Sequence, residues 1–302
     1  MESENFFEVD TNEAIQRLDI FLASKFENLS RSYIQTLIKN NLVSVNGQIK
    51  KSNYILKPND NIKMKIPAPQ NLSISPENIP LEIIYEDADI IIVNKPQGMV
   101  VHPGAGNFSG TLVNALLFHC KNLSGINGIL RPGIVHRIDK NTSGIIVVAK
   151  NDIAHRFLAT QFENHTITRQ YIGIVHGNLN ENGTINKPIG RSPVDRKKMA
   201  IKIGGKKAIT YYSVIENFTC YSLVKFKLET GRTHQIRVHM ASINHPLLGD
   251  DVYGKADKLF GLSGQALHAK ILGFTHPFTK KYIEFEQEPP EYFNKLIEKL
   301  RR

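Results

Sequence analysis

The hydrophobic positions near the start of the chain predict a small module with its own core, spanning residues 12–66. Apolar residues at helical spacing indicate two short helices, with Ile15, Leu18, Phe21 and Leu22 in the first and Ile34, Leu37 and Ile38 in the second. The second helix is expected to open at Ser30 or Ser32, because Ser32 and Gln35 have the spacing of a capping box. Apolar residues then alternate around Asn46-Gly47, a strong hairpin signal.

The remaining pattern predicts a linker followed by one larger domain. Four prolines between residues 67 and 80 indicate a linker without regular structure, which leaves residues 1–66 and 81–302 as the two domains. In the larger domain, strands are expected at residues 89–94, 144–149, 170–176, 208–216 and 223–229, and helices at residues 112–119, 152–163, 234–242 and 291–300. Because strands and helices do not alternate strictly, the predicted fold class is α+β.

Composition indicates an ordinary folded protein. The 302 residues are 41% apolar, enough to fill both cores, and no apolar run is long enough to span a membrane. The N-terminus is acidic and polar, so we expect neither secretion nor membrane insertion. The two cysteines, Cys120 and Cys220, could form one bridge at most and are typical of a reducing cytoplasm.

The charge of the chain indicates an anionic ligand. The net charge is +10 and the pI is about 9.4, a balance that attracts polyanions. Residues 31–65 carry seven Lys or Arg against one acid, and residues 185–210 carry eight against one. Two separate basic stretches suggest an extended nucleic acid, although lysines that merely solubilise the surface explain the charge equally well.

Two polar segments hold the candidate chemistry. Residues 133–144 bring together His136, Arg137 and Asp139 immediately before an apolar strand that would hold them rigidly. Residues 230–239 follow another strand and enter a helix that carries Arg237. If the two segments meet, a carboxylate faces a guanidinium group, and an ordinary structural ion pair is the alternative to a catalytic site.

The sequence contains no motif for metal binding, for a serine hydrolase or for nucleotide binding. HExxH and CxxC are absent, and His234 and His239 lie five residues apart, which is wrong for one helical face. Neither a GxSxG elbow nor a GxxxxGK[ST] or GxGxxG phosphate loop occurs. We therefore expect carboxylate chemistry on a nucleic acid, with no metal and no cofactor.

These segments support a resemblance to a known family. His136-Arg-Ile-Asp-Lys-Asn-Thr-Ser-Gly144 closely resembles the catalytic-aspartate loop of the RluA/RluD family of pseudouridine synthases. Further family motifs recur in the same order, together covering nearly all of residues 81–278: 93–103, 169–171, 196–200, 230–239, 245–254 and 265–268. The N-terminal module resembles the alpha-L RNA-binding domain, through residues 17–19, 29–32 and 45–47. The loop His102-Pro-Gly-Ala-Gly-Asn107 is most similar to the RluD branch.

The resemblance implies a mainly antiparallel sheet with flanking helices and a cofactor-free isomerisation of uridine. It makes Asp139 the carboxylate that acts at ribose C1′ or on the uracil ring, and Arg237 the partner that keeps Asp139 ionised and aimed. Tyr171 would stack on the detached base and take part in proton transfer. Because C1′ is inaccessible in a stacked nucleotide, the uridine must flip out, and Arg137 is expected to occupy the vacated position.

The resemblance also implies the RNA partner. The expected substrate is 23S ribosomal RNA, in particular the stem-loop that bridges the subunits, either as RNA or within a precursor large-subunit particle, bound by a monomer. The expected RNA-contacting residues are basic, although each could be a solvated surface charge: Arg31, Lys39, Lys50, Lys51, Arg191, Arg196, Lys197, Lys198 and Arg232. A non-catalytic ribosome-assembly factor and a synthase acting on transfer RNA remain the alternatives.

Overall fold

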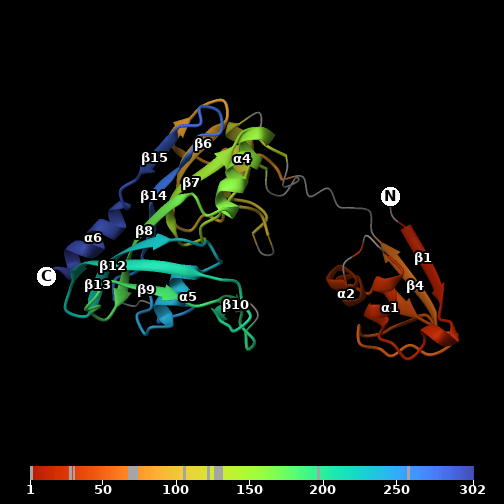
Figure 1. Cartoon of the computed structure of the whole chain (residues 1–302). Helices are drawn as coiled ribbons and strands as arrows, with labels where there is room; N and C mark the ends of the chain where they lie inside the picture. The colour runs from red at the N-terminus through yellow and green to blue at the C-terminus, as the bar shows by residue number, and fades with distance from the viewer. Residues whose placement is uncertain are drawn as a thin grey trace. The chain divides into compact units, whose positions relative to one another are not determined.

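The computed structural model describes residues 3–26, 29, 31–66, 74–104, 107–120, 123–125, 132–195, 198–256 and 259–302. The chain divides into two compact units, Met1–Leu72 and Ser73–Arg302 (Figure 1). No helix in these ranges is long and apolar enough to cross a membrane. Cys120 and Cys220 are both free thiols.

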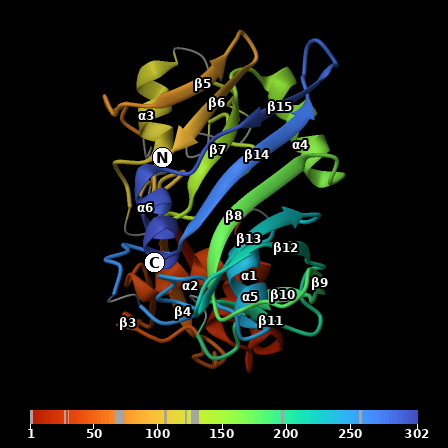
Figure 2. The same ribbon diagram turned by 90° about the vertical axis from the view of Figure 1, so that its left-hand side faces the viewer.

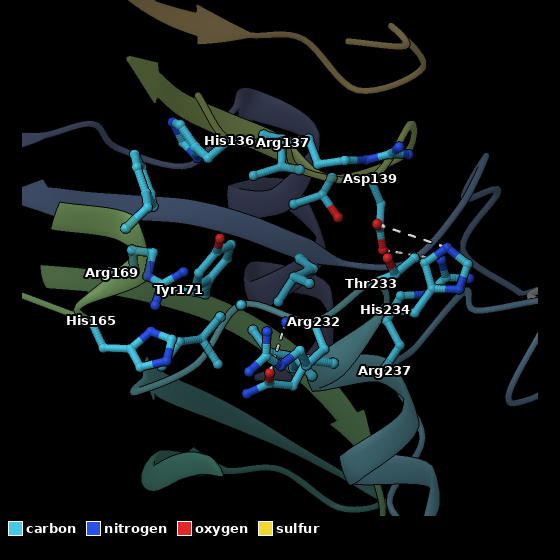
Figure 3. A pocket seen from close by; sticks show the side chains of 18 of the residues that line it. His136, Arg137, Asp139, His165, Arg169, Tyr171, Arg232, Thr233, His234 and Arg237 are labelled. Atoms are coloured by element: carbon cyan, nitrogen blue, oxygen red, sulfur yellow. Dashed lines mark hydrogen bonds and ion pairs between the residues drawn. The ribbon is translucent and has the colours of Figure 1, made fainter. Parts of the chain in front are cut away.

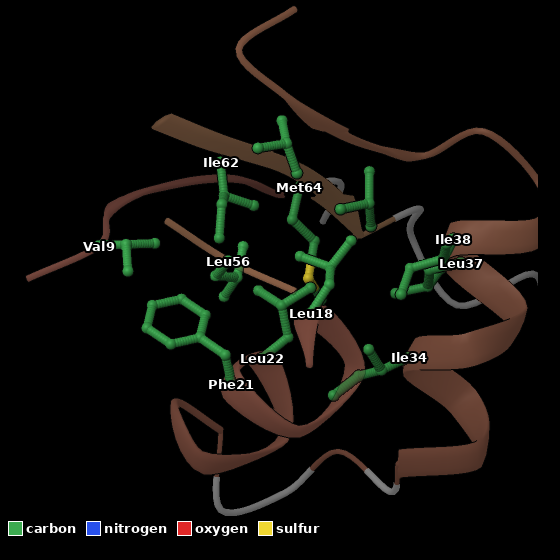
Figure 4. Close-up of a cluster of buried hydrophobic side chains, with 12 residues drawn as sticks. Val9, Leu18, Phe21, Leu22, Ile34, Leu37, Ile38, Leu56, Ile62 and Met64 are labelled. Carbon is green, nitrogen blue, oxygen red and sulfur yellow. The ribbon is translucent and has the colours of Figure 1, made fainter. Parts of the chain in front are cut away.

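The first unit packs two helices against a small antiparallel sheet. Its elements are β1 (Ser3–Glu8), a 3-10 turn (Thr11–Glu13), α1 (Leu18–Ser24), α2 (Arg31–Lys39), β2 (Val43–Val45), β3 (Gln48–Ile49) and β4 (Asn61–Ile66), with strand order β1-β4-β2-β3. The predicted hairpin is confirmed, because Asn46 and Gly47 both have positive φ, 51° and 75°, as a type I′ turn requires. The apolar stripes of both helices meet in one core (Figure 4).

The start of the first helix differs from the prediction. Ile15 is 85% exposed and has φ 66°, so it lies outside the helix and outside the core. Its N–H donates to the carbonyl of Leu56, which turns the chain before the helix begins at Leu18. Helical spacing alone could not exclude Ile15, because the turn is imposed by a segment about forty residues away in the sequence. Ser30 and the side chain of Ser32, the expected caps of α2, lie outside the described residues.

The second unit is built on one large sheet. Its strand order is β5-β6-β7-β14-β8-β13-β12-β9, and β15 also pairs with β14 (Figure 2). Among the strand pairs described, only β7–β14 is parallel. The strands are β5 (Glu82–Glu86), β6 (Ile90–Lys95), β7 (Ser143–Ala149), β8 (Thr168–His176), β9 (Gly183–Asn186), β12 (Ile209–Asn217), β13 (Tyr221–Leu228), β14 (Leu267–Thr275) and β15 (Tyr282–Glu286). The predicted α+β fold with a mainly antiparallel sheet is confirmed.

The helices of this unit are α3 (Leu112–His119), α4 (Asp152–Glu163), α5 (Gln235–Ala241) and α6 (Glu291–Leu300), and a separate hairpin joins β10 (Ile189–Arg191) to β11 (Met199–Ile201). The five predicted strands and four predicted helices are all present, each within two residues at its ends. The hydrophobic pattern missed β5, β9, β10, β11, β14 and β15. β14 was missed because polar residues, among them His268 and Lys270, interrupt its apolar positions.

The central strands are covered on both faces, which explains their unbroken apolar runs. Ile91 and Val93 of β6 pack with α3, whereas Ile90 and Ile92 pack with α4 on the opposite face. The segment 74–80, which we expected in the linker, has no regular secondary structure but is held by α3, because Asn114 donates to the carbonyl of Ser75 and accepts from the N–H of Glu77. The sheet and both helices therefore form a rigid support for the loop that precedes β7.

Candidate active site

The loop of residues 135–142, which carries Asp139, is fixed at both ends. At its start, the N–H of Val147 donates to Nε2 of His136, and the His136 ring stacks on Phe162 with centroids 4.5 Å apart. Burial lowers the pKa of His136 to about 3, so the ring is neutral and serves as an acceptor. At its end, the N–H of Thr142 closes a turn onto the carbonyl of Asp139. The loop therefore presents Asp139 from a backbone with little freedom.

A buried ammonium group ties the same loop to the end of β6. Lys95 is fully buried, and its Nζ donates to the carbonyls of Pro96, Met99 and Lys140 at 2.8, 2.9 and 3.1 Å. Burial lowers the pKa of Lys95, while the charge of Asp139 acts in the opposite direction. Lys95 thus joins two backbone segments immediately beside the catalytic candidate.

Where the loop enters β7, the backbone needs a glycine. Gly144 has φ +115°, and a Cβ there would collide with the backbone of Ala269 on β14. The close approach allows the short parallel pairing of β7 with β14, through Ser143–His268 and Gly144–Ala269. This pairing sets the loop of Asp139 over the middle of the sheet.

Arg237 on α5 lies between two carboxylates. Its Nη1 is 3.2 Å from Oδ2 of Asp139, so the expected contact is present. Its Nε and Nη2 donate to both oxygens of Asp250 at 2.7 and 2.8 Å, in a bidentate pair. Burial by itself lowers the pKa of Arg237, but the hydrogen bonds and charges of Asp250 and Asp139 outweigh it and raise that pKa. Asp250 thus fixes the guanidinium that faces Asp139.

Asp250 is itself fully buried, and its carboxylate accepts four hydrogen bonds. Besides Arg237, the backbone N–H groups of Val252 and Tyr253 donate to its Oδ1 at 3.0 and 3.1 Å. Burial raises the pKa of Asp250, and these donors, Arg237 above all, lower it to a net value below normal. The Arg237 side chain also lies over the Tyr253 ring, 5.1 Å from its centroid.

A second partner approaches Asp139 from the turn before α5. Nε2 of His234 lies 3.8 Å from Oδ1 of Asp139, and Nδ1 of His234 is 2.7 Å from the hydroxyl oxygen of Tyr253. That oxygen accepts from the N–H of Met199 at 2.9 Å, so the Tyr253 hydroxyl can donate to His234 and leave a proton on Nε2, toward Asp139. Burial lowers the pKa of His234, which favours this neutral ring.

Tyr171 on β8 supplies the aromatic group of the site. It is half-buried between two apolar clusters that adjoin on one face of the sheet, because its paired neighbours Ala269 and Phe226 belong one to each cluster. Burial raises the pKa of Tyr171 to about 12, so the phenol is protonated at neutral pH. In Figure 3 the ring stands between Asp139 and Arg169.

The side chains of Asp139, Tyr171, His234 and Arg237 line one cleft of about 440 Å³, a size typical of a ligand pocket. The Asp139 side chain is 16% exposed and the Arg237 side chain 6%, so the carboxylate is open to the cleft while its partner is not. A positioned carboxylate, a protonated phenol and a buried guanidinium can stabilise or attack an electron-poor sugar carbon and move a proton nearby. The structure therefore brings together the three predicted catalytic residues, Asp139, Tyr171 and Arg237.

The predicted RNA-contacting residues are not all at this cleft. Arg137 and Arg232 line it, and Arg137 is exposed with Nη1 3.5 Å from Nε2 of His102. Lys198 is half-buried and donates to the carbonyl of Val252, and Arg191 is exposed. Arg196 and Lys197 lie outside the described residues.

In the first unit, Lys39 and Lys51 are exposed, and Lys50 donates to Gln48. Arg31 is half-exposed but donates to Asp19, a fully buried carboxylate that also accepts from Arg17 and Gln35. Arg31 therefore stabilises the first unit through an ion pair with Asp19, and an RNA phosphate would have to share its guanidinium with that carboxylate.

Sequence reasoning missed several residues of the site. Asp250 lies in the motif 245–254 and Lys95 in the motif 93–103, so both were visible as matches to a family pattern but had no assigned task. Arg169, which is buried beside Tyr171, was likewise noted only as part of a motif. Asp250 acts through Arg237 and Lys95 through the carbonyl of Lys140, and no pattern of neighbouring residues indicates such contacts between distant parts of the chain.

Comparisons with known proteins agree with this site. A family model described as RNA pseudouridylate synthase matches residues 89–242, and an S4 domain model matches residues 16–62. An uncharacterized RNA pseudouridine synthase, YlyB, of Bacillus subtilis is 51% identical over 288 residues, 95% of each chain. The ribosomal large subunit pseudouridine synthase D of Zymomonas mobilis is 48% identical, covering 94% of this chain and 93% of its own.

Among solved structures, the human RNA pseudouridylate synthase domain containing 1 shares the fold, with a TM-score of 0.59 at 24% identity over 78% of this chain and 98% of its own. The family match covers the loop of Asp139, the strand of Tyr171 and the helix of Arg237. The relatives match over nearly the whole chain, with both units included. The chain therefore belongs to the RNA pseudouridylate synthase family and is a pseudouridine synthase with an N-terminal S4 domain.

Proposed function

We propose that this enzyme converts specific uridines of large-subunit ribosomal RNA to pseudouridine, with Asp139 as the catalytic carboxylate. The observation that carries the proposal is the array of Asp139, Arg237 and Asp250, in which a buried guanidinium aims one carboxylate into the cleft. The RNA class is supported by the relative of Zymomonas mobilis, which is named for the large ribosomal subunit.

The reaction cuts the bond from ribose C1′ to N1 of uracil and joins C1′ to C5. No atoms are gained or lost, so a carboxylate that attacks or stabilises the electron-poor ring suffices. Asp139 has this task because its carboxylate lines the cleft while Oδ2 is held by Arg237. The C5 hydrogen must then leave as a proton.

Tyr171 is the group for handling that proton or one at the sugar. Its phenol stays protonated at neutral pH because burial raises its pKa to about 12, and its ring offers a face for the detached base. Arg137 is exposed at the cleft and fills the position that the flipped uridine leaves in the RNA stack.

The S4 domain is proposed to dock the RNA outside the cleft. Its exposed Lys39 and Lys51 supply phosphate contacts, as does Arg191 of the second unit. The substrate we propose is the stem-loop that bridges the ribosomal subunits, bound as RNA or within a precursor large-subunit particle by a monomeric enzyme in the cytoplasm.

Release of tritium from C5 of uridine tests the reaction directly. Purified enzyme mixed with a ribosomal RNA fragment labelled at C5 should release tritium to water in the presence of a chelator and without ATP, NAD or S-adenosylmethionine. The product must migrate as pseudouridine with unchanged mass, because C5 methylation would also release the label. Transfer RNA labelled in the same way should release none.

Two matched variants assign the chemistry. Asp139→Asn should release no tritium yet bind RNA within a few-fold of wild type, because the amide keeps the shape but not the charge. Asp251→Asn makes the same change at an exposed position and should behave as wild type. Residual turnover by Asp139→Asn would show that Asp139 is not the catalytic carboxylate. A folded wild-type protein that releases no tritium from any RNA would instead favour the alternative of a non-catalytic ribosome-assembly factor.

A further inference from the structure

The end of the cleft away from Asp139 holds an arginine with an unusual environment. Arg169 on β8 is only 7% exposed, and its Nη2 donates to the backbone carbonyl of Glu229 at 3.1 Å. Its Nε is buried and has no hydrogen-bond partner. Within the described residues, no carboxylate lies at ion-pair distance from Arg169, in contrast to Arg237.

Two further basic residues line the same end. Arg232 lines the cleft with Arg169, and its guanidinium makes one hydrogen bond within the described part of the chain, from Nε to the carbonyl of Lys207. His165, which follows α4 in a left-handed conformation with φ 57°, lines it as well. Figure 3 shows Arg169, His165 and Arg232 on one side of the cleft and Asp139 on the other. Among the lining residues at this end the acid is Glu163, which is exposed at the rim; the nearby Glu229 carboxylate does not line the cleft and accepts from Lys207 and Tyr211 instead.

The backbone is shaped to admit this guanidinium. A Cβ on Gly231 would collide with Nη1 of Arg169, so the glycine leaves the space that the side chain occupies. The guanidinium lies over the Phe162 ring, 5.8 Å from its centroid. Burial lowers the pKa of Arg169 without removing its charge, and Tyr171 provides no counter-charge because its phenol is protonated.

A buried cation without a counter-charge destabilises the free enzyme unless a ligand supplies one. Guanidinium groups bind phosphate through charge-assisted, often bidentate hydrogen bonds, and two such groups, those of Arg169 and Arg232, line this end of the cleft. A neutral uracil carbonyl would satisfy the hydrogen bond but leave the charges of Arg169 and Arg232 uncompensated. The phosphodiester is the only anionic group that each nucleotide of the substrate brings into the cleft.

We propose that Arg169 and Arg232 form a phosphate subsite that binds one phosphodiester adjoining the flipped uridine. The inference rests on the proposed function, since it places the target nucleotide in this cleft. With its sugar at Asp139 and its backbone phosphate at Arg169, the nucleotide is fixed at two points on either side of Tyr171. The subsite therefore orients C1′ toward the carboxylate as well as adding affinity.

Neutral phosphates test the subsite. Short substrate RNAs are made with a single methylphosphonate at each linkage near the target uridine, and binding and kcat/KM are measured for wild type and Arg169→Gln. One linkage should weaken wild type by about tenfold or more, the usual effect of removing a charge-assisted hydrogen bond. The same linkage should cost Arg169→Gln much less than it costs wild type, because only Arg232 remains to bind the phosphate, and the variant should itself be weakened on unmodified RNA.

The controls separate phosphate binding from folding. Arg156→Gln removes an exposed arginine of α4 and should preserve both the affinity and the response to every methylphosphonate. If Arg169→Gln does not fold, Arg232→Gln carries the same test, and Arg169→Lys should keep part of the coupling. If the affinity loss from each methylphosphonate were the same in Arg169→Gln as in wild type at every linkage, Arg169 would not bind a phosphate. That result would overturn the subsite and leave Arg169 a structural residue.

The two proposals can fail separately. A wild type that releases tritium but shows no coupling at any linkage would sink the subsite and leave the proposed function intact. If Arg169→Gln and one methylphosphonate were coupled in RNA binding but the protein made no pseudouridine, the subsite would stand and the proposed function would fail.

Discussion

Asp250→Asn is expected to disturb the orientation of Arg237 while leaving the charge of Asp139 in place. Asp250 is fully buried and accepts four hydrogen bonds, two of them from Arg237. An asparagine retains one acceptor oxygen and places an NH₂ group against a guanidinium N–H. Arg237 is then left buried, with Asp139 as its remaining carboxylate.

The magnitude follows from that geometry. Breaking a buried pair from one side costs about 3–5 kcal/mol, and the lower end applies because Asp139 still compensates Arg237. In a unit of this size a loss of about 3 kcal/mol lowers the Tm by roughly 6–12 °C. Removal of one charge-assisted hydrogen bond to the aligning arginine should slow the chemical step by roughly 10–100-fold.

Single-turnover tritium release at saturating RNA, well below the Tm, separates alignment from stability. Asp250→Asn should bind RNA as wild type does but release label slowly, whereas Asp251→Asn, its exposed neighbour, should match wild type in Tm, RNA affinity and rate. A folded Asp250→Asn with a wild-type single-turnover rate would refute the reasoning, because Asp139 alone would then suffice to place Arg237.

Three further predictions concern other parts of the chain. Tyr171→Phe should keep RNA affinity and turn over about 10²–10⁴-fold more slowly if the hydroxyl moves a proton, and unchanged turnover would confine Tyr171 to stacking. Burial alone would raise the pKa of Asp19, but Arg17, Gln35 and Arg31 lower it to about 2, below the unfolded value. Stability of the first unit, followed by its amide NMR signals, should therefore be complete above pH 4 and fall by about 2 kcal/mol between pH 4 and 2, a fall that Asp19→Asn should abolish. Removing residues 1–72 should flatten the salt dependence of RNA binding by about 0.7–0.9 for each phosphate that the S4 domain neutralises, and an unchanged slope would exclude this domain as the docking element.

Local pattern predicted the α-helices of this protein but only part of its strands. The unbroken apolar run before Lys150 specified a strand covered on both faces, and Asn46-Gly47 specified a turn that few other dipeptides can adopt. Periodicity works for such elements because each depends on residues that are neighbours along the chain. It failed at Ile15 and at β14, where a distant carbonyl or a neighbouring strand decides the conformation.

The sequence by itself also determined which loop holds the catalytic carboxylate, since the motif around Asp139 is continuous. It did not determine the partners of that carboxylate, because Asp139 and Arg237 are 98 residues apart and meet only where the sheet and α5 bring them together. Tertiary structure decided that Asp250, rather than Asp139, takes the bidentate side of Arg237, and that Arg169 is buried without a counter-ion among the residues described. The physical reason is that the energy of a charge depends on the distance to other charges and on its burial, and chain order encodes neither.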